Sequence, residues 1–108
     1  MVEILRIDRG LIRILNLNET VEIEGVQVTA TDANHCPGAC LLLFETAKTK
    51  ILHVGDFRWN RQAILGCAPR LAALKPRDID HLYLDTTFND PKFDFPLQEQ
   101  VIAEGIRL

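Results

Sequence analysis

Alternation of apolar and polar residues is clearest between positions 20 and 30. Residues 21–23 and 26–30 alternate with a period of two, and the dipeptide Glu24-Gly25 lies between them. Two such runs around a two-residue glycine turn predict a β-hairpin. Upstream, residues 4–17 mix apolar and basic side chains, and that pattern fits either a strand or a helix.

Three further strands are predicted from apolar runs. Residues 39–45 form an apolar strand, residues 51–54 run back after a turn, and residues 81–84 form another strand. Apolar runs that do not alternate are typical of strands covered on both faces, as in a layered α/β domain. Residues 31–38 are rich in turn-forming residues, which predicts a loop.

Helices are expected in the second half of the chain. Residues 64–74 fit a helix that is interrupted by Pro69 and closed by Pro76, because proline cannot continue a helix from within. A loop over residues 89–96 precedes a final helix over residues 98–108, with Pro96 in its first turn. No C-cap signal follows that helix, so we expect the sequence to be cut from a longer one.

Composition limits the possible classes of protein. A chain of 108 residues has room for one domain, and a net charge of −3 argues against a basic nucleic-acid-binding surface. Bound cations would add positive charge that a residue count omits. The three cysteines, Cys36, Cys40 and Cys67, contain no C-x-x-C pair, which indicates a reducing compartment. Cys36 and Cys40 flank a Pro-Gly turn, which disfavours a shared metal. We expect no membrane span and no signal peptide.

Three polar residues follow apolar strands or lie in the loop between two of them: His35, Asp56 and Asp85. In open α/β sheets, ligands bind beyond the strand ends, where loops bring side chains into one crevice. Imidazole nitrogens and carboxylate oxygens suit zinc or manganese. A pair of such ions could bind a phosphodiester and activate water for its hydrolysis.

Each of these residues also has a structural interpretation. His35 could be an ordinary loop histidine, and Asp56 and Asp85 could each cap a turn or a helix. From position alone, both interpretations stay open.

Other polar residues have less specific positions. His53 lies inside an apolar strand and is predicted to be a core histidine, whereas His81 at a strand start is predicted to be on the surface. Arg58 and Trp59 could contact a nucleic acid through charge and stacking, or serve the fold.

Three strings resemble one known family. They are Asp-Ala-Asn-His-Cys-Pro-Gly-Ala at residues 32–39, Leu-His-Val-Gly-Asp-Phe-Arg at 52–58 and Leu-Tyr-Leu-Asp-Thr-Thr-Phe at 82–88. Their order and separation resemble the DNA cross-link repair nucleases of the metallo-β-lactamase/β-CASP superfamily, the group that includes Artemis and Apollo. The resemblance extends over roughly residues 21–101, and it covers only the middle of that family's catalytic region.

The resemblance implies a fold and a set of site residues. The fold would be an α/β structure, part of an αβ/βα sandwich and roughly its second half. Residues 1–90 would form a partial metallo-β-lactamase domain, and residues 91–108 the start of the β-CASP region. His35 would be a zinc ligand, Asp56 would bind or bridge the metals, and Asp85 would support the site from nearby.

The resemblance also implies an activity. The complete enzyme would hydrolyse DNA phosphodiesters, commonly from 5′ to 3′, with one or two zinc ions or with manganese. It would act on damaged DNA in the nucleus, during interstrand cross-link or double-strand break repair.

This sequence departs from the family in one important respect. The H-x-H-x-D-H string that supplies most of the family's metal ligands is absent, and its place would lie before Met1. We therefore expect the chain alone to bind metal weakly or not at all and to lack nuclease activity. Two alternatives are an RNA-processing nuclease of the same superfamily and a truncated, non-catalytic product that binds a partner.

Overall fold

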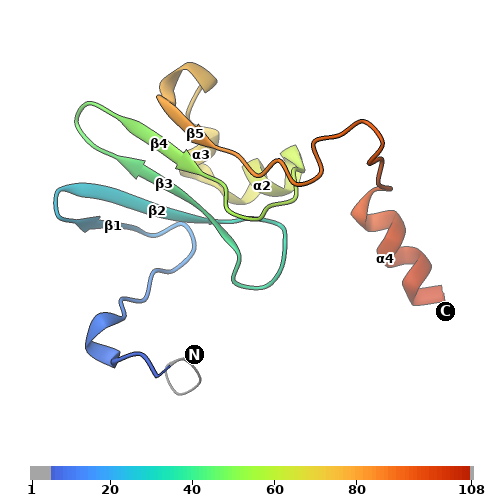
Figure 1. Cartoon of the computed structure of the whole chain (residues 1–108), viewed down its shortest axis with the longest axis horizontal. Helices are drawn as coiled ribbons and strands as arrows, with labels where there is room; N and C mark the ends of the chain where they lie inside the picture. Colours follow the sequence, from blue (N-terminus) through green and yellow to red (C-terminus); the bar gives the residue numbers. More distant parts are fainter. Residues whose placement is uncertain (1–5, 108) are drawn as a thin grey trace.

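The computed structural model describes residues 6–107 of the chain. Figure 1 shows a five-stranded sheet, in which the strands lie in the order β1-β2-β3-β4-β5. The strands are β1 (Thr20–Ile23), β2 (Val26–Asp32), β3 (Cys40–Glu45), β4 (Lys50–His53) and β5 (His81–Tyr83). The helical elements are η1 (Arg9–Leu11), α2 (Arg61–Cys67), α3 (Pro69–Ala72), η2 (Pro76–Asp78) and α4 (Gln98–Arg107).

The predicted hairpin is confirmed. β1 and β2 pair antiparallel, with Ile23 opposite Val26 at the turn. Glu24 and Gly25 both adopt positive φ angles, 50° and 82°. Positive φ at both central residues defines the type I′ turn, whose twist matches that of the two strands it joins. A short sequence signal was sufficient here because the turn is local.

The sheet is mixed, and its strand directions decide where its loops lie. β3 pairs antiparallel with both β2 and β4, and β5 pairs parallel with β4. β2, β4 and β5 therefore run in the same direction. The predicted loop over residues 31–38 begins too early, because Thr31 and Asp32 pair with Leu41 and Cys40 and continue β2.

The first predicted helix starts earlier than expected. α2 begins at Arg61, after an N-cap at Asn60 whose side-chain oxygen accepts the N–H of Ala63 at 3.0 Å. Such a cap satisfies one of the free donors at a helix start. The break expected at Pro69 is confirmed, since that proline opens the separate helix α3.

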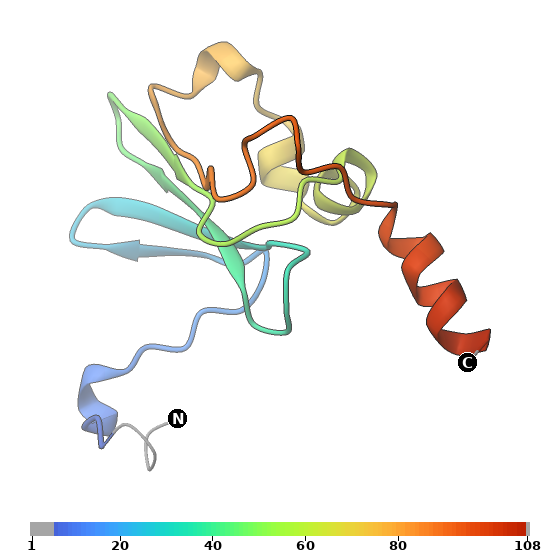
Figure 2. The same cartoon turned by 45° about the vertical axis from the view of Figure 1, so that its right-hand side comes forward.

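The final helix is confirmed as α4, which begins two residues after Pro96 rather than with that proline in its first turn. Leu108 lies outside the described residues. In Figures 1 and 2, α4 extends away from the sheet. Among residues 6–107, no helix combines the length and the apolar character that a membrane crossing requires.

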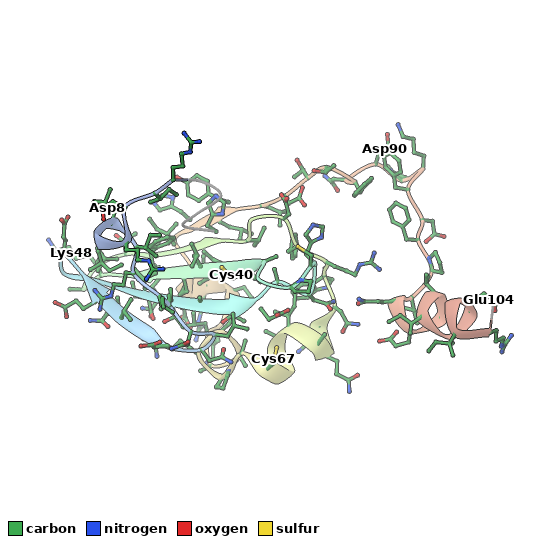
Figure 3. The ribbon with its side chains drawn as sticks, turned by 90° about the horizontal axis from the view of Figure 1, so that it is seen from below. Asp8, Cys40, Lys48, Cys67, Asp90 and Glu104 are labelled. Carbon is green, nitrogen blue, oxygen red and sulfur yellow. The ribbon has the colours of Figure 1, made fainter. Side chains whose placement is uncertain are left out.

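The core lies between the sheet and the helices α2 and α3. Ala33, Leu41, Val54 and Ile64 form its buried cluster. Figure 3 shows Cys67, at the end of α2, on one side of the sheet and Asp90 on the other side. Because Ile64 belongs to α2 and the other three residues lie at or next to ends of β2, β3 and β4, the cluster joins the helical layer to the sheet.

The prediction that the apolar strands are covered on both faces is wrong for all three of them, and no residue of β4 is fully buried. Every residue of β5 is exposed, and Leu82 and Tyr83 keep 54% and 58% of their surface accessible. In β3, Leu42 and Phe44 are only half-buried between fully buried neighbours. An apolar run indicates that a strand can be covered on both faces, but only the packing of other segments decides whether it is.

An ion pair with a buried carboxylate ties α3 to the sheet. Glu45 is the last residue of β3 and is only 6% exposed. Its two carboxylate oxygens accept hydrogen bonds from Nε and Nη2 of Arg70, at 2.9 and 2.7 Å. A carboxylate is costly to bury unless it is paired in this way.

Replacing Arg70 with methionine should lower the free energy of unfolding by about 1–3 kcal/mol, because the buried carboxylate of Glu45 loses its partner. The Arg70 side chain is 54% exposed, so water can reach part of the vacated site and limit the loss. Urea denaturation measures the effect. The control Arg77→Met, at an exposed position, should change stability by less than about 0.5 kcal/mol. Equal losses in both variants would contradict this role of the pair.

Candidate functional site

The loops that follow β2, β4 and β5 meet at one edge of the sheet. Because these strands run in the same direction, their carboxyl ends lie together. The N–H of Arg58 donates to the carbonyl of Ala33 at 3.1 Å and joins the first two loops. The N–H of Val54 donates to the carbonyl of Tyr83 at 3.0 Å and joins the ends of β4 and β5. Figure 1 shows these three strand ends converging.

His35 lies in the loop between β2 and β3, and it is exposed. The loop contains two residues with positive φ, Asn34 at 52° and Gly38 at 92°. The N–H of Asn34 donates to Oδ1 of Asp32 at 2.7 Å, and the N–H of Ala39 donates to the carbonyl of Cys36 at 2.9 Å. Two local turns therefore shape the backbone on either side of the imidazole.

Asp56 follows β4 and is exposed. Gly55, just before it, has a φ of 57°, in the left-handed region that glycine adopts without strain. This conformation turns the chain out of the sheet directly after β4. The carboxylate is thereby presented beyond the strand end, as the sequence predicted.

Asp85 follows β5 and is half-buried. Its Oδ1 accepts hydrogen bonds from the hydroxyl and the N–H of Thr87, at 2.6 and 2.9 Å. These bonds are the main causes that hold the pKa of Asp85 below its usual value. The backbone N–H of Phe57 and the positive charge of His35 lower this pKa further, against an opposing effect of partial burial.

These interactions bring the three predicted residues into one region. Asp85 lies within electrostatic range of His35 and within reach of Phe57, the neighbour of Asp56. Within residues 6–107, however, no three His, Cys, Asp or Glu side chains are grouped so that they could hold a metal ion. The donors suit zinc in kind but not in number, because a catalytic zinc takes three protein ligands.

The prediction for His53 is wrong. This residue is exposed instead of lying in the core, and its ring stacks on Tyr83 with centroids 5.5 Å apart. Its Nδ1 accepts the N–H of Gly55 at 3.1 Å. β4 is apolar, but the neighbouring strand β5 is exposed, so the side of the sheet that carries His53 is exposed as well. His81 is exposed, which confirms its predicted surface position.

Two further candidates keep both of their interpretations. Arg58 and Trp59 are exposed, Trp59 with 64% of its surface accessible, as a contact with a nucleic acid would require. The backbone of Arg58 also holds the first two loops together through Ala33, which is a structural role.

Sequence reasoning missed three residues that shape the site: Asp32, Asn34 and Thr87. Their contribution is a set of hydrogen bonds between side chain and backbone over two residues. Aspartate commonly accepts the N–H two residues further on, so the spacings Asp-x-Asn and Asp-x-Thr carried a usable signal.

Comparison with known proteins finds relatives, several of them named for DNA cross-link repair, and no protein-family profile matches the chain. The DNA cross-link repair protein pso2/snm1 of Schizosaccharomyces pombe is 34% identical over 106 residues. The DNA cross-link repair 1A protein of Gallus gallus is 40% identical over 103 residues, and protein artemis of Danio rerio is 43% identical over 89 residues. The matches cover 94%, 94% and 78% of this chain, but the chain spans only 18%, 10% and 13% of those proteins.

Removing the Thr87 hydroxyl should raise the pKa of Asp85 toward its usual value. The Thr87→Val variant loses the largest cause of the lowered pKa and keeps the N–H bond, so the shift should be partial. Titration of the Asp85 carboxyl carbon by NMR measures it. The neighbouring substitution Thr86→Val should leave this pKa unchanged, and an equal rise in both variants would show that the hydroxyl bond is not the cause.

Proposed function

Because this chain is homologous to the SNM1/PSO2 and Artemis family of DNA cross-link repair proteins over about 94% of its length, we propose that it is a segment of a metal-dependent DNA nuclease. The observation that carries the proposal is the meeting of three loops at one sheet edge, each with one candidate site residue. These residues are His35, Asp56 and Asp85. The relatives are named for DNA cross-link repair, which supports DNA as the substrate.

The proposed roles follow from the chemistry of each side chain. His35 is exposed and offers an imidazole nitrogen, and Asp56 is exposed and offers a carboxylate, which supports metal binding by both. Asp85 stays ionised more readily than a free aspartate because of Thr87 and His35. We assign it a catalytic role beside the metal, where its negative charge acts on the His35 imidazole.

The implied metal is zinc, with manganese as a second option that suits the same donors. Such an ion acts as a Lewis acid on a phosphodiester. His35 and Asp56 would hold it in part, and we infer that another segment of the parent protein supplies the remaining ligands. The share of the relatives that the chain spans, 10–18% for the two DNA cross-link repair proteins, leaves room for such a segment.

Finer properties belong to the same proposal. The parent enzyme would be a 5′-to-3′ exonuclease that acts on damaged DNA in the nucleus, in interstrand cross-link and double-strand break repair. Residues 1–90 would belong to a metallo-β-lactamase domain, in its αβ/βα sandwich, and residues 91–108 would begin the β-CASP region. The change from the layered sheet to the projecting helix α4 supports a boundary in this part of the chain.

A second candidate is a non-catalytic product that binds a partner. The exposed apolar residues Leu82, Tyr83 and Leu84, on and just after β5, favour it, because apolar patches of this kind mark interaction sites. An RNA-processing nuclease of the same superfamily ranks lower, since the relatives reported above carry names from DNA repair. DNA and RNA cleavage by the same protein would separate these candidates.

A replacement experiment tests the proposal in a complete protein. This chain would take the place of the matching 106-residue region of the Schizosaccharomyces pombe relative. The chimaera should restore the survival of cells that lack that protein after treatment with a DNA cross-linking agent. His35→Ala and Asp56→Ala should each abolish the rescue, because each removes a metal ligand.

The matched control is His81→Ala, which removes an exposed imidazole outside the site. This variant should rescue as well as the unmodified chimaera. If His35→Ala and Asp56→Ala also rescue fully, the proposed metal site is wrong. The purified chimaera should cleave single-stranded DNA in preference to RNA, and the reverse preference would favour the RNA-processing candidate.

Metal binding by the chain itself gives a second test. We expect zinc titration followed by calorimetry to show weak binding or none, because His35 and Asp56 leave the coordination shell incomplete. His35→Ala should remove any binding that is seen, and His81→Ala should not. Tight binding of two ions would overturn the inference that other ligands are needed.

A further inference from the structure

We propose that Asp32 and Asn34 are positioning residues, which hold the His35 loop against the segment that carries Asp56. The inference deepens the proposed function and rests on it, because it concerns the same pair of ligands. Neither Asp32 nor Asn34 needs to touch a metal or a substrate in this role.

The first element of this arrangement is the turn at the end of β2. Oδ1 of Asp32 accepts the N–H of Asn34 at 2.7 Å, a short bond of the kind that a charged acceptor makes. Asn34 is held with a φ of 52°, in the left-handed region. Most residues are disfavoured in that region, whereas asparagine adopts it more readily. The turn therefore fixes the direction in which the chain leaves toward His35.

The second element joins this turn to the loop after β4. Ala33 lies between Asp32 and Asn34, and it is fully buried in the core cluster with Val54 and Ile64. Its carbonyl accepts the N–H of Arg58 at 3.1 Å. The side-chain amide of Asn34 reaches the carbonyl of Arg58 at 3.4 Å, which is a longer and weaker bond.

The two elements together constrain the distance between the ligands. His35 directly follows Asn34, and Asp56 lies two residues before Arg58. Hydrogen bonds to the N–H and the carbonyl of Arg58 hold the two loops, and with them His35 and Asp56, at a fixed separation. The buried side chain of Ala33 anchors this contact to the core. Metal ligands must be held to about 0.5 Å to bind well, so a support of this kind has a direct functional consequence.

Amide hydrogen exchange of the chain without metal tests the arrangement. Asp32→Ala should speed exchange at the Arg58 N–H by about tenfold relative to core amides, because the turn that presents the Ala33 carbonyl is released. Asp32→Asn keeps an oxygen acceptor and should restore most of the protection. Asn34→Gly, which adopts positive φ freely, should disturb the Arg58 N–H less than Asn34→Ala does.

Arg70→Met is the matched control, because it removes the ion pair with Glu45 at the far end of β3 and destabilises the fold without touching either loop. It should speed exchange at core amides such as that of Leu43 and at Arg58 alike. If Asp32→Ala leaves Arg58 exchange unchanged, or changes all amides as Arg70→Met does, the positioning role is wrong.

A paramagnetic measurement links the arrangement to the ligands. Manganese ions added to the isotope-labelled chain should broaden the NMR signals of His35 and Asp56 at the same manganese concentration. In Asp32→Ala, the two signals should broaden at different concentrations. Asp32→Asn should keep the two signals together. Joint broadening that persists in Asp32→Ala would overturn the positioning role. Absence of broadening in the unmodified chain would agree with the incomplete coordination shell, and the exchange data alone would then decide the positioning role.

Discussion

The direction of the strands is the constraint on which the rest of this structure depends. β3 runs antiparallel to both of its neighbours, and β5 joins β4 in parallel, so the carboxyl ends of β2, β4 and β5 share one edge. Each of these ends continues into a loop that carries one of the three candidate residues. Reversing any one strand would move its loop to the opposite edge and separate the group. The backbone hydrogen bonds of the sheet therefore bring these three loops together.

The ion pair that stabilises the fold and the candidate functional residues lie at opposite ends of the strands in the same sheet. The ion pair between Glu45 and Arg70 is at the carboxyl end of β3, which is the edge away from His35 and Asp85. Because no side chain is shared between the two places, substitutions at one should act nearly independently of substitutions at the other. The Asp32 turn and the Thr87 hydroxyl bonds shape the loop edge locally, through contacts over two residues.

The similarity to DNA cross-link repair proteins supports the function proposed for this arrangement. The chain matches these proteins over nearly its whole length, yet it spans about a tenth to a fifth of theirs. A shared segment of this size leaves most of the relatives' length outside the region that this chain matches. The exposed apolar surface of β5 is consistent with a segment that packs against more protein.

The sequence by itself determined the local features of this protein. The type I′ hairpin at Glu24-Gly25, the strands and the break at Pro69 follow from residue periodicity and backbone preference, which act over a few residues. The strand-end positions of His35, Asp56 and Asp85 follow from the same pattern. Only the tertiary structure decided the extension of β2 through Asp32, the exposure of His53 and the approach of Asp85 to His35. These features depend on which distant segments pair and pack. A local sequence pattern does not specify the distant segment with which a strand or loop will pack.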